Sequence, residues 1–179
     1  SSIKTLKAAV SYEKSIVIGT TGFSSEQKKI ISQAAEKMRC VFAPNMSVGV
    51  NVLFKIVEDV SKVLGDAYDI EIVEAHHKFK KDAPSGTAIS ILDGIIENNK
   101  NKSKWHLGHA VKNESIPVNV KRTDPTPGTH SVTYSTSIDA IEIKHTAHSR
   151  DGFAQGSLTA AQWLIGKTGV FGMKDMLKF

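Results

Sequence analysis

The sequence predicts an α/β protein that is organised as two domains, and three observations support this. Short apolar, β-branched runs alternate with helical patterns over residues 1–46, which is typical of a parallel α/β unit. A middle segment then carries several strands of alternating hydropathy, and a closing helix follows them. The chain has 179 residues, enough for one or two domains.

The composition is that of a globular protein, with 40% hydrophobic and 23% charged residues. No apolar run approaches the roughly 18 residues that a membrane-spanning helix needs, and the first residues show no signal-peptide pattern. The single cysteine, Cys40, cannot form a disulfide within the chain, which indicates a reducing, cytoplasmic compartment. The net charge of +5 and the pI of about 9.2 suit an anionic small molecule as well as a nucleic acid.

The first 46 residues are predicted to form helix, strand, helix and strand. Apolar residues at helical spacing predict a helix over residues 3–10, and the β-branched run 15–19 is typical of a buried strand. Ser24 and Gln27 form a capping box that starts a second helix, which we expect to end near residue 37. Residues 41–43 predict the second buried strand.

The middle segment begins with a strong helix. Apolar residues recur at three- and four-residue steps up to Leu64, and Gly65 stands where a C-cap belongs. Polar and apolar residues alternate over residues 69–75, which predicts a half-buried strand, and the triplet Ser85-Gly86-Thr87 opens a helix. After a polar connection we expect three strands, at residues 118–122, 131–136 and 140–144. A last helix is expected to begin near Phe153.

Residues 74–87 hold the highest density of reactive side chains, at a strand end, a loop and a helix start, where ligand sites are common. Ser85 can cap the helix, Gly86 lets a ligand approach the backbone, and Thr87 adds a hydroxyl. The unpaired N–H groups of a helix start bind carboxylate or phosphate.

Two kinds of charged or titratable side chain precede this helix start. Lys80 adds a mobile cation. His76 or His77 can transfer a proton near neutral pH, and on an extended strand the two side chains point in opposite directions.

The same residues also fit a plainer interpretation, a turn with a solvated basic run and an ordinary N-cap, and the pattern leaves both open. A metal site at His76 and His77 is disfavoured, because no HExxH or CxxC motif accompanies them. Residues 100–105 mix lysines with a tryptophan, as nucleic-acid-binding loops do. Because the charge is confined to one short segment, we favour a solvated linker there.

Two loops follow the buried strands of the first 46 residues, at the carboxyl ends where nucleotides bind in parallel sheets. They are Gly19-Thr20-Thr21-Gly22 and Ala43-Pro44-Asn45-Met46. No GxGxxG motif occurs in the chain, so these residues do not predict a site for the pyrophosphate of a dinucleotide.

Residues 74–88, with the sequence EAHHKFKKDAPSGTA, resemble the signature of the 4-hydroxy-tetrahydrodipicolinate reductases, formerly called dihydrodipicolinate reductases, of lysine and diaminopimelate biosynthesis. Residues 19–23, 45–51 and 145–164 are similar to other blocks of that family, so the resemblance covers essentially the whole chain. Family members begin with a GxGxxG βαβ segment, and this sequence starts downstream of it. Pro44 stands where alanine is commoner, and residues 121–130 look altered and shortened.

The resemblance implies a fold and an activity. The fold is a partial Rossmann-type nucleotide-binding domain, from residues 1–47 and 150–179, and an α+β substrate-binding and tetramerisation domain with a mixed sheet, from residues 48–149. The activity is the reduction of 4-hydroxy-tetrahydrodipicolinate to tetrahydrodipicolinate by NADH or NADPH. The implied partners are a small dicarboxylate substrate and further copies of the chain in a homotetramer, with no nucleic acid and no membrane.

The resemblance also implies roles for single residues. His76 is the proton donor and acceptor, and Lys80 holds and polarises the substrate and is also called a proton donor in the family. His77, Gly86 and Thr87 bind a substrate carboxylate. The residues implied to line the nicotinamide end of the cofactor are Gly19, Thr20, Thr21, Ala43, Pro44, Asn45 and Met46. No metal is implied.

Two other functions stay open at this point. Without a first βαβ unit the nucleotide-binding sheet lacks its leading strand, which predicts an inactive, substrate-binding or oligomer-forming remnant of such a reductase. A different two-domain dehydrogenase that acts on another acidic substrate fits the same pattern.

Overall fold

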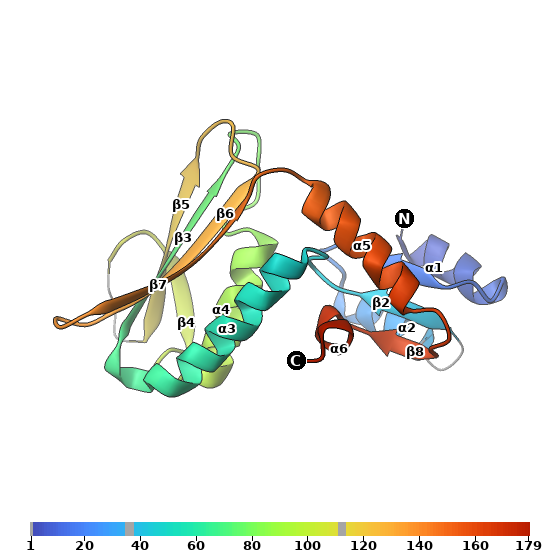
Figure 1. The fold of residues 1–179 in the computed structure, drawn as a ribbon, viewed down its shortest axis with the longest axis horizontal. Coiled ribbons are helices and arrows are strands. Elements are labelled where there is room, and N and C mark those ends of the chain that lie inside the picture. Colours follow the sequence, from blue (N-terminus) through green and yellow to red (C-terminus); the bar gives the residue numbers. More distant parts are fainter. Residues whose placement is uncertain (1, 35–37, 111–113) are drawn as a thin grey trace. The chain divides into compact units, whose positions relative to one another are not determined.

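In the computed structural model, residues 2–34, 38–110 and 114–179 are described, and the chain divides into two compact units (Figure 1). The first unit combines Ser1–Asn51 with Asp151–Phe179, and the second is Val52–Arg150. The predicted division into a nucleotide-binding and a substrate-binding domain, at residues 47 and 150, stays a prediction.

The first unit is a three-stranded parallel sheet with helices on both faces. Its strands are β1 (Ile16–Ile18), β2 (Arg39–Phe42) and β8 (Gly169–Phe171), in the order β1-β2-β8. Its helices are α1 (Ser2–Ser11), α2 (Ser25–Ala34), α5 (Asp151–Trp163) and α6 (Met173–Leu177). Cys40 packs in one core cluster with residues of α1 and α2, and Val41 in another with residues of α5 and α6. Because neighbouring strand residues point to opposite faces, the helices form two layers around the sheet.

The capping box sets the start of α2 as predicted. The Gln27 N–H donates to Ser24 Oγ at 3.2 Å, and the Ser24 N–H donates to Gln27 Oε1 at 2.9 Å. The predicted end of this helix near residue 37 lies outside the described residues. Strand β8 and helix α6 were not predicted, because three and five residues span too few periods for a hydropathy pattern.

The second unit is a five-stranded mixed sheet in the order β4-β5-β3-β6-β7. Its elements are α3 (Val48–Leu64), which begins in the first unit, a 3₁₀ turn (Gly65–Ala67), β3 (Asp69–His76), α4 (Gly86–Asn98), β4 (Lys104–Leu107), β5 (Ser115–Arg122), β6 (Gly128–Ser135) and β7 (Ala140–Ala147). The central strand β3 is parallel to β5 and antiparallel to β6, so the predicted mixed sheet and the α/β fold class are confirmed. Strand β4 was not predicted.

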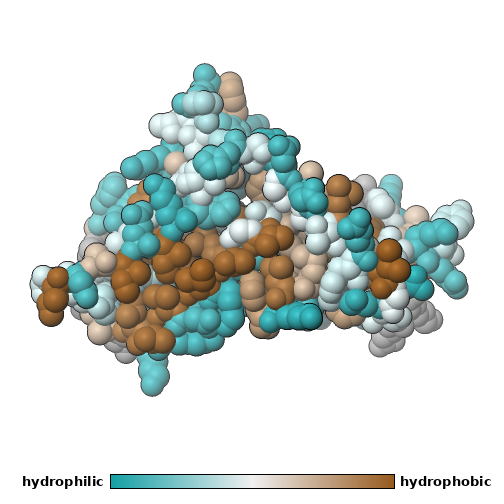
Figure 2. Space-filling view, in the orientation of Figure 1, coloured by the Kyte–Doolittle hydropathy of each residue, from teal (hydrophilic) through white to brown (hydrophobic). Residues whose placement is uncertain are grey.

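Helices α3 and α4 cover one face of this sheet (Figure 1). The hydroxyls of Ser61 on α3 and Tyr134 on β6 lie 2.8 Å apart in the core. The helices approach each other closely at Gly94, where an added Cβ would lie 3.1 Å from Glu58 Cγ. Figure 2 shows apolar side chains gathered over α3, where Val52 and Ile56 are exposed. No helix among the described residues is both long and apolar enough to cross a bilayer.

Candidate functional site

The inward face of three neighbouring strands changes from apolar to polar at one end. On β3, two buried isoleucines are followed on the same face by Glu74 and His76. The antiparallel register places His130 of β6 opposite Glu74, and the parallel register places Arg122 of β5 opposite His76. These four side chains therefore meet at the sheet end that precedes α4.

Glu74 is a fully buried carboxylate with a hydrogen-bond donor at each oxygen. Arg122 Nη2 donates to Oε1 at 3.2 Å, and the Ser85 N–H donates to Oε2 at 3.0 Å. Burial by itself raises the pKa of this carboxyl, but the bonds from Ser85, together with His76 and Arg122, outweigh it and hold the pKa below its ordinary value. Glu74 is therefore ionised at neutral pH.

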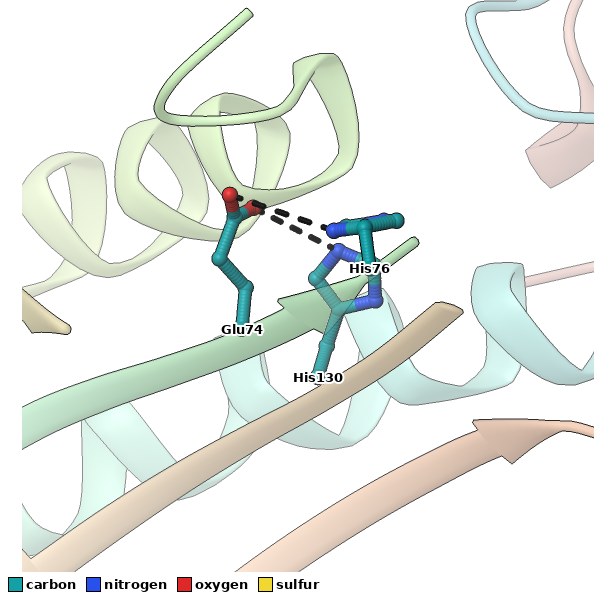
Figure 3. Close-up of side chains that lie close together, drawn as sticks. All are labelled: Glu74, His76 and His130. Carbon is teal, nitrogen blue, oxygen red and sulfur yellow. Dashed lines mark ion pairs between the residues drawn. The ribbon is translucent and has the colours of Figure 1, made fainter. Parts of the chain in front are cut away.

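Two imidazoles lie beside this carboxylate, next to each other (Figure 3). His76 Nδ1 lies 3.9 Å from Glu74 Oε1, and His130 Nε2 lies 3.8 Å from Oε2. Burial is the largest cause that lowers the pKa of each imidazole, and the Glu74 charge opposes it. The pKa of His130 falls to about 4. Both rings are therefore neutral at neutral pH.

The start of α4 has the features of the predicted anion receptor. Ser85 is its N-cap, as predicted, and Ser85 Oγ accepts a hydrogen bond from the Ala88 N–H at 3.1 Å. Gly86 is exposed, Thr87 is half-buried, and the first turn itself contains no acidic residue. The Glu74 carboxylate accepts from the Ser85 N–H, one residue before this turn.

The loop between β3 and α4 carries the predicted lysine. Lys80 Nζ lies 2.8 Å from both carboxylate oxygens of Asp82. Arg122 donates to the backbone carbonyls of Lys80 and Asp82, at 3.4 and 2.7 Å, and so fixes this loop against β5. His77 is half-buried, with its ring centroid 6.4 Å from that of Phe79. The predicted proton-transfer and substrate-binding residues all belong to the second unit.

The two predicted nucleotide-binding loops follow β1 and β2, which are adjacent parallel strands of the first unit. The exposed members are Gly19, Thr20, Thr21 and Pro44, and the buried ones are Ala43, Asn45 and Met46. An added Cβ at Gly19 would lie 3.6 Å from Met46 Cγ, so the two loops touch. An exposed glycine–threonine loop at this edge fits the close backbone approach that a nicotinamide nucleotide needs. Contact of these seven residues with a cofactor stays a prediction.

Among the residues that the structure describes, one group of possible metal ligands has its donor atoms within 4.8 Å of one another: Glu74, His76 and His130. Both carboxylate oxygens already accept hydrogen bonds, and one of the donors is the guanidinium of Arg122. A cation beside this guanidinium is disfavoured by like charge. We therefore interpret the group as two imidazoles packed beside the buried Glu74 carboxylate, and not as a metal site.

Sequence reasoning assigned no role to Glu74, Arg122 or His130. The period-two alternation of β3 could have indicated that Glu74 is buried, because this residue lies on the same face as the two buried isoleucines. Arg122 and His130 come from other strands, and only the strand register shows that they meet Glu74.

Replacement of Ser85 by alanine should lower the free energy of unfolding by about 1–2 kcal/mol, because the helix cap is lost and a buried partner of His130 is removed. Urea denaturation measures the change. Ser90→Ala in the same helix removes only a bond to the Gly86 carbonyl and should stay within about 0.5 kcal/mol of the wild type. Equal stability of the two variants would contradict the capping role.

Comparison with known proteins matches both parts of the chain to one family. The description "Dihydrodipicolinate reductase, C-terminus" matches residues 49–177, and "Dihydrodipicolinate reductase, N-terminus" matches residues 1–46. The 4-hydroxy-tetrahydrodipicolinate reductase of Geobacter sp. (strain M21) is 42% identical over 185 residues, which are 98% of this chain and 69% of that protein. The corresponding protein of Methanoculleus marisnigri (strain ATCC 35101 / DSM 1498 / JR1) is 40% identical over 98% of this chain and 71% of that protein.

A solved structure has the same fold. It is described as dipicolinate-bound dihydrodipicolinate reductase from Paenisporosarcina sp. TG-14. The TM-score is 0.75 at 24% identity, and the match covers 96% of this chain and 67% of that one.

Proposed function

Because this chain belongs to the dihydrodipicolinate reductase family, we propose that it reduces 4-hydroxy-tetrahydrodipicolinate to tetrahydrodipicolinate with NADH or NADPH. The observation that carries the proposal lies within the second unit, where His76, Lys80 and the accessible start of α4 come from one strand, loop and helix. A small ring with two carboxylates needs anion receptors and a proton donor, and these are the groups present.

The substrate carboxylates bind to Lys80 and to the first turn of α4. Lys80 Nζ, which contacts Asp82 in this structure, offers a charge-assisted hydrogen bond to one carboxylate. Gly86 and Thr87 offer backbone N–H groups and the positive end of the helix dipole, and His77 lies on the same segment. These contacts fix the orientation of the ring before the reaction.

The nicotinamide nucleotide, when bound, supplies the hydride, and the protein contributes position and charge. The exposed loop of Gly19, Thr20 and Thr21 and the neighbouring Ala43–Met46 loop would hold its nicotinamide end. NADH and NADPH have the same nicotinamide ring, so the hydride transfer is the same with either cofactor. The 2′-phosphate that distinguishes them plays no part in this step.

His76 supplies the proton that the reduced ring takes up. Without substrate its imidazole is neutral at neutral pH, because burial lowers its pKa. A doubly charged anion nearby raises the pKa of an imidazole, so substrate binding favours uptake of the proton that is later transferred.

We also propose that the protein forms a homotetramer through the second unit. The face of the five-stranded sheet that lies away from α3 and α4 has no helix from the described residues of the second unit over it (Figure 1). A sheet face left open in this way is available to pair with a second copy. Light scattering coupled to size-exclusion chromatography tests this, and a monomer would contradict it.

The family match over nearly the whole chain does not favour the alternative of an inactive remnant. The direct test is an assay of the purified protein with enzymatically prepared 4-hydroxy-tetrahydrodipicolinate and either nucleotide. We expect nucleotide oxidation that depends on the substrate. Failure with both nucleotides would contradict the proposal, and turnover only with another acidic substrate would favour a different dehydrogenase.

Replacing Lys80 with glutamine should lower kcat/KM by about 10- to 100-fold, because a charge-assisted hydrogen bond to the substrate is lost. Steady-state kinetics with varied substrate measure this. The matched control is Lys81→Gln, since Lys81 is the exposed neighbour and should leave kcat/KM unchanged. Equal losses in the two variants would mean that general charge, and not Lys80, attracts the substrate.

A further inference from the structure

Two buried residues of the site, Glu74 and His130, have no part in the chemistry described so far. We propose that Glu74 is a positioning residue that fixes the tautomer of His76, and that Glu74 and His130 connect this imidazole to the start of α4. The role of His76 in this inference rests on the proposed function, but the tautomer itself can be measured without turnover.

The environment of His76 Nδ1 favours one tautomer of the ring. This atom is buried and has no hydrogen-bond partner within normal distance, and Glu74 Oε1 faces it at 3.9 Å. A small movement of the ring closes this gap to a hydrogen bond, which needs about 3 Å. An ionised carboxylate only accepts hydrogen bonds, so the proton of the neutral imidazole must sit on Nδ1. Nε2 is then the atom that exchanges a proton with a ligand.

The backbone beside His76 leaves space at Nε2. Gly128, the first residue of β6, lies beside this edge of the ring. An added Cβ there would lie 3.3 Å from His76 Nε2, tighter than nine in ten real Cβ contacts, and 3.4 Å from Cδ2. Glycine at this position therefore leaves the reactive edge of the imidazole uncrowded.

The Glu74 carboxylate is held in place by its hydrogen bonds. Its two oxygens accept hydrogen bonds from Arg122 and from the Ser85 N–H, so the carboxylate cannot rotate away from His76 without breaking one of them. Arg122 is in turn held by the loop carbonyls of Lys80 and Asp82. A proton-transfer group is precise when its partners are themselves held in place.

Ser85 connects Glu74 and His130 to the start of α4. Ser85 donates its N–H to Glu74, and its Oγ both accepts from Ala88 and lies 3.0 Å from His130 Nε2. The His130 ring also packs against His76, with 5.1 Å between centroids. An anion that binds the first turn of α4 therefore binds next to the groups that position His76.

The charges around His76 determine the direction of the expected change. The groups that face it are Glu74 from β3, Lys80 and Asp82 from the following loop, Arg122 from β5 and His130 from β6. Among these, Glu74 is the buried anion, and it stabilises the imidazolium. Removing its charge should therefore make His76 harder to protonate.

The first test is nitrogen NMR of the wild-type protein labelled with ¹⁵N-histidine, with His76 assigned by the signals that disappear in His76→Gln. We expect the neutral ring of His76 to carry its proton on Nδ1. A ring protonated on Nε2 would overturn the proposal. This measurement needs no Glu74 variant to fold and no substrate.

The second test compares Glu74→Gln with Glu74→Asp and with Glu71→Gln, which removes a charge from the opposite face of the same strand. The titration midpoint of His76 should fall by about 1–3 pH units in Glu74→Gln. It should stay near the wild-type value in Glu74→Asp and Glu71→Gln, and an unchanged midpoint in Glu74→Gln would overturn the proposal. If Glu74→Gln does not fold, the wild-type tautomer decides.

Kinetics give a third readout. In the proposed step the Nε2–H bond of the imidazolium breaks and its electron pair stays on Nε2. The hydrogen forms a bond to the reduced ring, and a proton from the bulk solvent later restores Nε2–H. A proton donor with a lower pKa loses its proton at lower pH, so the alkaline limb of the kcat profile should move to lower pH in Glu74→Gln, with KM little changed. A protein with the expected tautomer but no reductase activity would contradict the proposed function and leave this inference intact.

Discussion

Replacing His76 with glutamine should lower kcat by about 10²- to 10⁴-fold and leave KM within a few-fold of the wild type. Glutamine has a similar reach and can form hydrogen bonds, but it cannot exchange a proton near neutral pH. The loss therefore falls on the chemical step and not on substrate binding. Steady-state kinetics at saturating nucleotide, with the substrate varied, measure the two constants separately.

The neighbouring histidine provides the control. His77 is predicted to bind a substrate carboxylate, so His77→Gln should raise KM and leave kcat largely unchanged, the opposite division of effects. Unchanged turnover in His76→Gln would remove this residue from the mechanism. Equal effects of the two variants on kcat would contradict the separate roles of the two histidines, proton transfer for His76 and carboxylate binding for His77.

Replacing Gly156 with alanine should lower the free energy of unfolding of the first unit by about 3 kcal/mol or more. This is opposite to the usual effect within a helix, where alanine is favoured over glycine by about 0.5–1 kcal/mol. Gly156 lies in the middle of α5, and an added Cβ would lie 1.8 Å from the carbonyl oxygen of Met46 and 2.8 Å from its carbon. Backbone atoms cannot yield as a flexible side chain does, so the helix or the loop has to move.

The same helix contains a matched control. An added Cβ at Gly152 meets only Ser47 Oγ, at 3.6 Å, which is an ordinary contact. Gly152→Ala should therefore stay within about 0.5 kcal/mol of the wild type. Urea denaturation followed by circular dichroism measures both variants. Equal stability of the two variants would contradict the close approach of α5 to the Met46 carbonyl. Because Met46 belongs to the predicted cofactor loop, Gly156→Ala should also weaken NADH or NADPH binding.

Several elements could be predicted from local patterns because their signals are local. The capping box at Ser24 and Gln27 and the N-cap at Ser85 involve residues three apart in sequence, and the structure contains both. The long apolar periodicity up to Leu64 likewise predicted α3. Strands β4 and β8 and helix α6 are short, and neighbours in space stabilise them more than their own pattern does.

The sequence by itself determined the α/β class, the family resemblance and the cluster of His76, Lys80 and the α4 start, because these residues lie on one continuous strand, loop and helix. Only the tertiary structure decided what surrounds Glu74. Arg122 is 48 positions away in sequence, and His130 is 45 positions from Ser85. Such residues meet through strand register, and the register depends on the packing of the whole sheet. A slip of one residue would move every side chain of the strand to the other face.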